Sequence, residues 1–280
     1  MEPFVWLNDD LIPWSQARVS VNDRGFQYGD GLFETLRAEA GRVWFLTEHL
    51  ARLGASAAAF RLPFAQGISW EERIDRLLAA NSLSRGLARV KIQLTRGEAP
   101  GLGLPRECRP TLVMWALPYT PPAAAEYAAG WPVVIFPEMR TTFLGRHKTI
   151  NYLFYLAARQ YALDHGAREA LILEADGCVS EGAATSLVYE EKGQFYTPAA
   201  PSALPGVTVA ALARALKAQG LTLTAVSTSV GQLQGSEGLW LANSLLGLMP
   251  VAALDRQTIP ISAQSGFLQE VLWAAAQQVD

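Results

Sequence analysis

In the first part of the chain, apolar residues recur with two periods. Alternation over residues 90–94 is typical of a half-buried strand, and residues 32–38 and 111–117 also favour strands. Helical spacing over residues 47–60 predicts a helix whose first residue, a threonine, is the N-cap. A capping-box pair, Ser and Glu, opens a second predicted helix at residue 69. This half therefore mixes strands and helices.

The second part shows the same mixture. Helical periods predict helices over residues 150–163, 206–219 and 263–277. Short apolar runs bounded by turn residues predict strands, and these lie at residues 133–136, 170–173, 178–179, 185–189 and 239–242. Several of the strands are joined by hairpin turns, which argues for α+β domains rather than a doubly wound parallel sheet.

A proline-rich stretch, residues 117–123, separates the two patterned halves. Connectors of this composition often mark domain boundaries. We therefore expect two domains, a smaller one over residues 1–118 and a larger, cofactor-binding one over residues 119–280.

Composition narrows the class of protein. Half of the residues are hydrophobic, 18% are charged and the formal net charge is −3, which predicts a globular protein that does not bind nucleic acid. We expect no membrane helix and no signal peptide, because the sequence lacks a long apolar run and a basic start. The two cysteines are far apart, so we expect no metal site and a reducing, cytoplasmic location.

Lysine chemistry has few candidates, because the chain has four lysines: Lys91, Lys148, Lys192 and Lys217. Lys148 follows Arg146 and precedes an amphipathic helix. Neighbouring cations and apolar walls would lower its pKa and favour a nucleophilic, Schiff-base amine. A solvated loop lysine is the alternative that this local pattern leaves open.

Four other positions have two interpretations each. The segment Gly206–Thr208 is either an anion site at a helix start or an ordinary glycine-proline turn. Glu181, which precedes three small residues, lies beside a bulky ligand or on the surface. Arg52 is a ligand-binding side chain or a partly buried surface one, and Arg96 is a carboxylate clamp or a surface charge.

The order of these features along the chain resembles the class IV aminotransferase family. The blocks that carry the resemblance are Asp23–Thr35, Glu48–Leu53, Lys148–Leu153, Val179–Gly182, Leu204–Thr208, Asn243–Ser244 and Pro250–Val251. They follow the family's order and cover most of the chain. The resemblance implies the two-domain, fold-type IV architecture, a homodimer, and pyridoxal 5′-phosphate held between the domains.

The resemblance also implies a role for particular residues. Lys148 is expected to form the Schiff base, Glu181 to face the pyridine nitrogen and keep it protonated, and Tyr152 to lie near the phenolic oxygen. The remaining expected cofactor-binding residues, mainly phosphate ligands, are Arg52, Gly206, Val207, Thr208, Asn243 and Ser244.

Within the family, Thr35 and the Asn243–Ser244 pair resemble aminodeoxychorismate lyases. We therefore expect elimination that yields 4-aminobenzoate and pyruvate for folate synthesis, with Lys148 as carrier and general base and Thr35 assisting. The expected substrate-binding residues are Phe33, Arg96 and Arg146. A second arginine that such lyases often carry shortly after Arg96 is absent, which leaves the second substrate carboxylate without an obvious partner; Arg146 is a candidate.

The sequence leaves two alternative functions open. A transaminase acting on D-amino or branched-chain amino acids shares every step up to proton removal. A regulatory or vestigial cofactor-binding protein is the other, and the intact Lys148 and Glu181 argue against it.

Overall fold

A computed structural model describes residues 2–64 and 67–277 and divides them into two compact units. The first unit comprises the residues up to Thr120 together with His147–Asn151, and the second comprises Pro121–Arg146 and the residues from Tyr152 onward. The expected boundary lay at residues 118–119. The first unit is built from two separate stretches of chain, and the second stretch carries Lys148.

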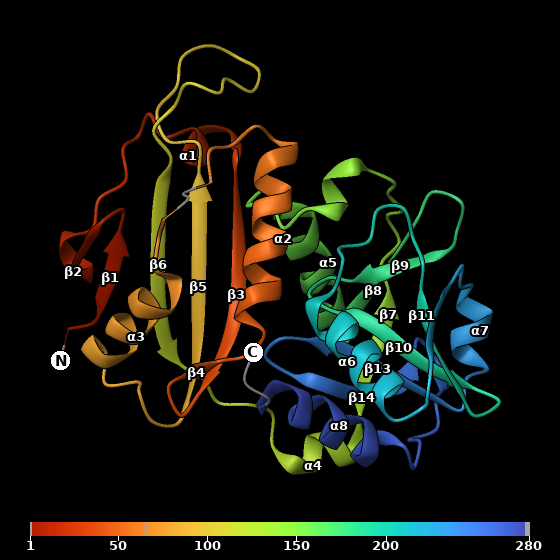
Figure 1. The fold of residues 1–280 in the computed structure, drawn as a ribbon. Coiled ribbons are helices and arrows are strands. Elements are labelled where there is room, and N and C mark those ends of the chain that lie inside the picture. Colours follow the sequence, from red (N-terminus) through yellow and green to blue (C-terminus); the bar gives the residue numbers. More distant parts are fainter. Residues whose placement is uncertain (1, 65–66, 278–280) are drawn as a thin grey trace. The chain divides into compact units, whose positions relative to one another are not determined.

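The first unit is an antiparallel sheet with helices on one face (Figure 1). Its strands lie in the order β2-β1-β6-β5-β3-β4. The elements are β1 (Phe4–Leu7), β2 (Asp10–Pro13), the 3-10 helix η1 (Trp14–Gln16), α1 (Arg24–Tyr28), β3 (Gly31–Glu39), β4 (Arg42–Val43), α2 (Leu46–Ala59), α3 (Trp70–Ala80), β5 (Leu87–Thr95) and β6 (Thr111–Pro118).

Strand β5 shows how this sheet divides its residues between two faces. Val90, Ile92 and Leu94 are buried and join the hydrophobic cluster formed with α2 and α3. Arg89 and Lys91, which alternate with them, lie on the opposite face and are half-buried. The predicted half-buried strand is therefore confirmed, and the sheet has one apolar and one polar face.

Of the two predicted helix starts in this unit, the first was wrong and the second was confirmed. Helix α2 begins at Leu46, and its N-cap is Phe45 in the left-handed region (φ 55°), so Thr47 is not the cap. The chain reverses from β4 into the helix within two residues, and the left-handed residue makes that reversal. Ser69 is the N-cap of α3, but its side chain makes no capping hydrogen bond.

The second unit is a mixed sheet with flanking helices. Strand order is β12-β11-β10-β13-β14-β7-β8-β9, with β15 pairing β14, and three pairs are parallel: β11 with β12, β14 with β7, and β7 with β8. The elements are α4 (Ala124–Ala129), β7 (Trp131–Ile135), the 3-10 helix η2 (Phe143–Arg146), α5 (Leu153–Asp164), β8 (Glu169–Leu173), β9 (Val179–Gly182), β10 (Ser186–Glu191), β11 (Gln194–Pro198), α6 (Val207–Ala218), β12 (Leu223–Val226), α7 (Val230–Gln234), β13 (Gly238–Asn243), β14 (Gly247–Leu254), β15 (Gln257–Thr258) and α8 (Ser265–Gln277).

The α+β prediction is confirmed in both units. Helix α6 lies within the predicted range 206–219, whereas α5 begins at Leu153 instead of residue 150. The start is late because Ile150 donates its N–H to the Gly31 carbonyl, which holds that stretch extended beside β3. Among the described residues, no helix has the length and apolarity needed to cross a membrane.

Candidate functional site

Lys148 lies on a short extended segment that pairs with the start of β3. The Phe33 N–H donates to the Lys148 carbonyl at 2.8 Å, and Leu32 forms a bridge with Thr149. The Lys148 ammonium nitrogen lies 4.6 Å from the centroid of the Phe33 ring. Backbone pairing with β3 therefore fixes the position of the Lys148 main chain, and the Phe33 ring lies next to its amine.

The preceding residue is also held to the first unit. His147 Nδ1 lies 3.0 Å from the Ser56 hydroxyl on α2, and its ring packs edge-on against Phe60 at 4.8 Å between centroids. The lysine segment is thus attached to β3 by its backbone and to α2 by a side chain.

Thr35 shares a face of β3 with Phe33, because the two residues are two positions apart in an extended strand. Their Cα atoms are about 7 Å apart on this geometry. Since the Lys148 amine lies over the Phe33 ring, the lysine and Thr35 belong to the same face of the first sheet. Thr35 is half-buried and pairs across the strands with Lys91.

Glu34 points to the opposite face and binds two side chains of α2. Arg52 donates to both of its oxygens, at 2.8 and 2.6 Å, and His49 Nδ1 lies 2.7 Å from Oε2. Burial alone would raise the pKa of Glu34, but the hydrogen bonds from His49 and Arg52 outweigh it and lower the pKa to about 2. The expected phosphate ligand Arg52 therefore has a buried protein carboxylate as a partner.

The lowered pKa of Glu34 predicts an acid-dependent loss of stability. The ionised form is favoured in the folded state, so its contribution is complete above about pH 4.5 and is lost as the pH falls towards 2. In Glu34→Gln, we expect the free energy of unfolding to fall less steeply over this range, by on the order of 1.4 kcal/mol per pH unit.

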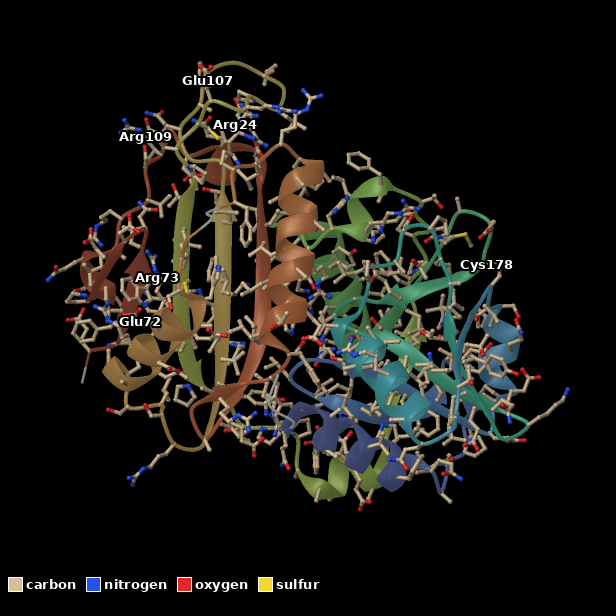
Figure 2. All side chains as sticks on the ribbon, in the orientation of Figure 1. Arg24, Glu72, Arg73, Glu107, Arg109 and Cys178 are labelled. Atoms are coloured by element: carbon tan, nitrogen blue, oxygen red, sulfur yellow. The ribbon has the colours of Figure 1, made fainter. Side chains whose placement is uncertain are left out.

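Denaturant unfolding between pH 2 and 6 measures this difference. The exposed Glu72 on α3, labelled in Figure 2, offers the matched control Glu72→Gln, which should keep the wild-type slope. Equal slopes for wild type and Glu34→Gln would contradict the assignment.

Arg96 has a structural role, which corrects the expectation that it binds substrate. Its side chain is fully buried, and Nε and Nη2 donate to the Asp30 carboxylate at 2.7 and 3.1 Å. The terminal nitrogens also donate to the carbonyls of Phe60, Arg61 and Pro105. These contacts use all five N–H donors of the guanidinium, so none is left for a substrate carboxylate.

Arg24, labelled in Figure 2, binds the loop between β5 and β6, which Arg96 also contacts through Pro105. Its Nε donates to Asp30 at 2.8 Å, and its terminal nitrogens donate to the carbonyls of Gly101 and Gly103. Burial would raise the pKa of Asp30, but the hydrogen bonds from Arg96 and Arg24 outweigh it and keep the pKa low. One carboxylate between two arginines thus anchors the β5–β6 loop, residues 96–110.

Glu181 is the centre of a buried polar group in the second unit. Oε1 accepts from the Tyr155 hydroxyl at 2.7 Å and from Arg140 at 3.2 Å, while Oε2 accepts from the Leu204 N–H at 3.0 Å. The side chain is 6% exposed. This resolves the sequence alternatives against a surface position.

Tyr152 stacks on Tyr155, with ring centroids 4.8 Å apart and an interplanar angle of 24°. Its hydroxyl donates to the Ala183 carbonyl at 3.0 Å. Burial, and then the charges of Glu169 and Glu181, raise the pKa of Tyr152 well above its usual value, so the phenol stays neutral. It can therefore act as a hydrogen-bonding group beside Glu181.

The loop that leads to α6 is held by Glu174. This carboxylate accepts from the hydroxyls of Thr141, Ser180 and Ser202, at 2.7, 2.7 and 2.9 Å, and from the Ser202 N–H at 3.0 Å. Arg146 is exposed, and its Nε donates to the Pro201 carbonyl at 2.6 Å. The expected substrate residue Arg146 therefore packs on this loop through one nitrogen.

Helix α6 begins where a phosphate site was expected. Gly206 is its N-cap and supplies no side-chain cap, and Val207 and Thr208 are buried in the first turn. A Cβ at Gly206 would collide with the Ser186 hydroxyl unless that side chain moved, so the position favours glycine. The narrow approach and the N–H groups of the first turn suit an anion.

Asn243 shapes the turn that carries Ser244. Its Oδ1 accepts from the N–H groups of Leu245 and Leu246 at 3.0 and 2.8 Å, and its Nδ2 donates to the Ala184 carbonyl at 3.1 Å. The Asn243 side chain therefore holds the turn in place.

Sequence comparison places the chain in a family. Residues 31–254 match the family described as amino-transferase class IV. The chain belongs to the class IV aminotransferase family. The D-alanine aminotransferase of Bacillus licheniformis is 27% identical over 95% of this chain and 94% of its own length.

Solved structures of class IV enzymes share the fold. The branched-chain amino acid aminotransferase of Escherichia coli superposes with a TM-score of 0.88 at 22% identity, covering 99% of this chain and 95% of that one. The "putative 4-amino-4-deoxychorismate lyase" of Legionella pneumophila gives a TM-score of 0.85 at 25% identity, covering 94% and 97%. The expected fold-type IV architecture is therefore confirmed.

Class IV aminotransferases use pyridoxal 5′-phosphate, and the residues of this chain fit that group. The first unit offers the amine of Lys148 beside the Phe33 ring. The second offers the buried Glu181 carboxylate and the start of α6, whose N-cap is a glycine. An amine, a carboxylate and an anion-binding helix start are the three kinds of group that the aldehyde, pyridine and phosphate of the cofactor require.

Three residues near these groups were missed from the sequence. Tyr155 could have been found, because it lies three positions after Tyr152 on the same helical face. Glu34 alternates with the buried Leu32 and Leu36 on the apolar face of β3, and a charged residue there signals a buried partner. No local pattern marks Arg140, whose partner Glu181 is 41 residues away.

Proposed function

We propose that the chain is a pyridoxal-phosphate-dependent 4-amino-4-deoxychorismate lyase that releases 4-aminobenzoate and pyruvate. The observation that carries the proposal is the position of Thr35. It lies on the face of β3 that also carries Phe33, over whose ring the Lys148 amine lies. A hydroxyl beside a working amine suits an elimination, which needs a proton for the departing oxygen.

When bound, pyridoxal phosphate supplies an electron-withdrawing ring that stabilises negative charge on the substrate carbon. Lys148 would carry the cofactor until the substrate amine takes its place there, and the freed Lys148 amine would then accept the proton from the carbon that bears the substrate amine. The carbon–oxygen bond to enolpyruvate breaks, the six-membered ring becomes aromatic, and Thr35 positions or passes the proton that the departing oxygen receives.

Glu181 would sustain the positive charge of the pyridine nitrogen in this scheme. Arg140 and Tyr155 keep its Oε1 in place, which supports a fixed, charged carboxylate. The first turn of α6 and the Asn243–Ser244 turn would hold the phosphate, together with Arg52, whose orientation Glu34 fixes.

Transamination of D-amino or branched-chain amino acids is the second candidate. It is supported by relatives that are named as D-alanine and branched-chain aminotransferases. The two reactions differ in the cofactor that they leave, an aldehyde after elimination and an amine after transamination. A homodimer and a cytoplasmic location complete the proposal, and both rest on the family resemblance and the cysteine usage.

Thr35→Val is expected to slow formation of 4-aminobenzoate by roughly 10²-fold, the lower range for general acid–base assistance. Valine has nearly the same shape, so cofactor binding and the visible spectrum should be unchanged. The measurement is 4-aminobenzoate release from aminodeoxychorismate, with the exposed Thr224 of β12 giving the control Thr224→Val.

Three results separate the possibilities. A slow Thr35→Val variant beside an active wild type supports the lyase and the role of Thr35. Full activity in Thr35→Val removes that role. A wild type that makes no 4-aminobenzoate but converts D-alanine or leucine to the keto acid replaces the lyase with the transaminase.

A further inference from the structure

A second buried carboxylate, that of Glu174, lies among the segments of the second unit that carry Glu181 and its partners. Glu174 directly follows β8, and the residue is only 1% exposed. It accepts four hydrogen bonds, all from neutral donors: the hydroxyls of Thr141, Ser180 and Ser202, and the N–H of Ser202. Burial would raise the pKa of Glu174, but these hydrogen bonds outweigh it and lower the pKa. The buried carboxylate is therefore ionised.

Two of the three donor residues are chain neighbours of groups in the Glu181 cluster. Thr141 follows Arg140, which donates to Glu181 Oε1 at 3.2 Å. Ser180 precedes Glu181 itself on β9. Because side chains alternate along a strand, Ser180 and Glu181 point to opposite faces of β9. Glu174 thus binds the Glu181 strand from its other face and acts on Glu181 through the chain.

The third donor residue secures the remaining partner of Glu181. Ser202 lies two positions before Leu204, whose N–H donates to Glu181 Oε2 at 3.0 Å. The Ser202 hydroxyl, which donates to Glu174, also accepts from the Thr142 N–H at 2.8 Å. Glu174 therefore ties together three separate stretches of chain, near residues 141, 180 and 202, and each stretch supplies the Glu181 carboxylate or one of its donors.

We propose that Glu174 is a positioning residue that determines how strongly Glu181 favours the proton on the pyridine nitrogen of pyridoxal phosphate. Its ionised carboxylate keeps Glu181 and two of its donors in a fixed arrangement, so the negative charge of Glu181 stays at one place. This inference rests on the proposed role of Glu181. It does not depend on the choice between elimination and transamination, because both reactions use the protonated ring.

Nuclear magnetic resonance of the cofactor-loaded enzyme tests the inference without turnover. The probe is pyridoxal phosphate labelled with nitrogen-15 in its ring, and the chemical shift of that nitrogen against pH shows where it loses its proton. In Glu174→Gln, one amide N–H would meet a donor and release part of the arrangement. We therefore expect the ring nitrogen to lose its proton roughly one pH unit lower than in wild type, a tenfold weaker hold.

Two further variants calibrate this measurement. Glu181→Gln should lower the titration of the ring nitrogen by more than Glu174→Gln does. Glu270, which is exposed on α8, provides the matched control Glu270→Gln, and this variant should titrate as wild type does. An unchanged titration in Glu181→Gln would remove the role of Glu181 and the inference with it.

The double variant Glu174→Gln/Glu181→Gln separates positioning from a general loss of stability. If Glu174 acts through Glu181, the double variant should titrate as Glu181→Gln does, because coupled residues are not additive. Thermal unfolding of the same proteins measures stability independently. Ser180→Ala removes one of the four hydrogen bonds to Glu174. It should shift the titration in the same direction by less, and it serves as the test if Glu174→Gln does not fold.

A folded Glu174→Gln or Ser180→Ala enzyme with the wild-type titration overturns the inference, whatever stability it has lost. A further decrease in the double variant, equal to that of Glu174→Gln alone, also overturns it. Release of 4-aminobenzoate by wild type judges the lyase separately, so either proposal can fail while the other stands.

Discussion

Lys148→Ala is expected to lower turnover by at least about 10⁴-fold. General acid–base catalysis by one residue contributes up to ~10⁴-fold, and the same lysine is also the proposed covalent carrier of the cofactor. The loss should be equal for lyase and transaminase assays, because both reactions depend on this amine. Release of 4-aminobenzoate and formation of keto acids from D-alanine and leucine measure it.

The fold should survive this substitution. The contact that joins residue 148 to β3 is made by its backbone carbonyl, which accepts from the Phe33 N–H and does not depend on the side chain. Lys192→Ala is the matched control, since that lysine is 88% exposed in a turn of the second unit. A folded Lys148→Ala enzyme that retains even a tenth of wild-type activity contradicts the role given to Lys148.

Glu181→Gln is expected to reduce turnover by about 10²- to 10³-fold, the effect of removing one preorganised electrostatic group. Glutamine has the same shape but lacks the negative charge that would hold a proton on the pyridine nitrogen. The residue also accepts from Tyr155, Arg140 and Leu204, so one amide N–H would meet a donor. We therefore expect a stability loss of about 1–3 kcal/mol as well.

Tyr155→Phe separates these two effects. It removes one hydrogen bond to Glu181 but leaves the carboxylate charged, so it should lower stability with less than about a tenfold loss of turnover. Turnover and thermal unfolding of both variants provide the comparison. If Glu181→Gln and Tyr155→Phe lose the same activity, the charge of Glu181 is not what matters.

The periodicity of apolar residues predicted those elements that bury one face and expose the other. The alternation over residues 90–94 and the helical period after Gly206 both agree with the structure. The start of α5 could not be predicted, because residues 148–150 pair with β3 more than 110 residues earlier in the chain. The prediction of Thr47 as the N-cap of α2 was wrong for a related reason. The chain reversal after β4 places Phe45 in the left-handed region and makes it the N-cap.

Some residues of the candidate site could be predicted from the sequence, and others depend on contacts between distant parts of the chain. Lys148 and Glu181 could be selected because their blocks follow the order of a known family. Arg96 was misassigned because its partner Asp30 is 66 residues away, and sequence alone cannot show that all donors are already bonded. The pairing of Glu34 with Arg52, 18 residues apart, likewise requires the strand and helix to be packed together.

Borohydride reduction followed by peptide mapping tests the central claim most directly. The yellow, cofactor-loaded protein should lose its long-wavelength band on reduction, and the cofactor should then be fixed to the peptide that contains Lys148. The chain has four lysines, so the assignment is a choice among known positions. A colourless protein that does not take up pyridoxal phosphate, or a cofactor fixed to Lys91, Lys192 or Lys217, would contradict the account.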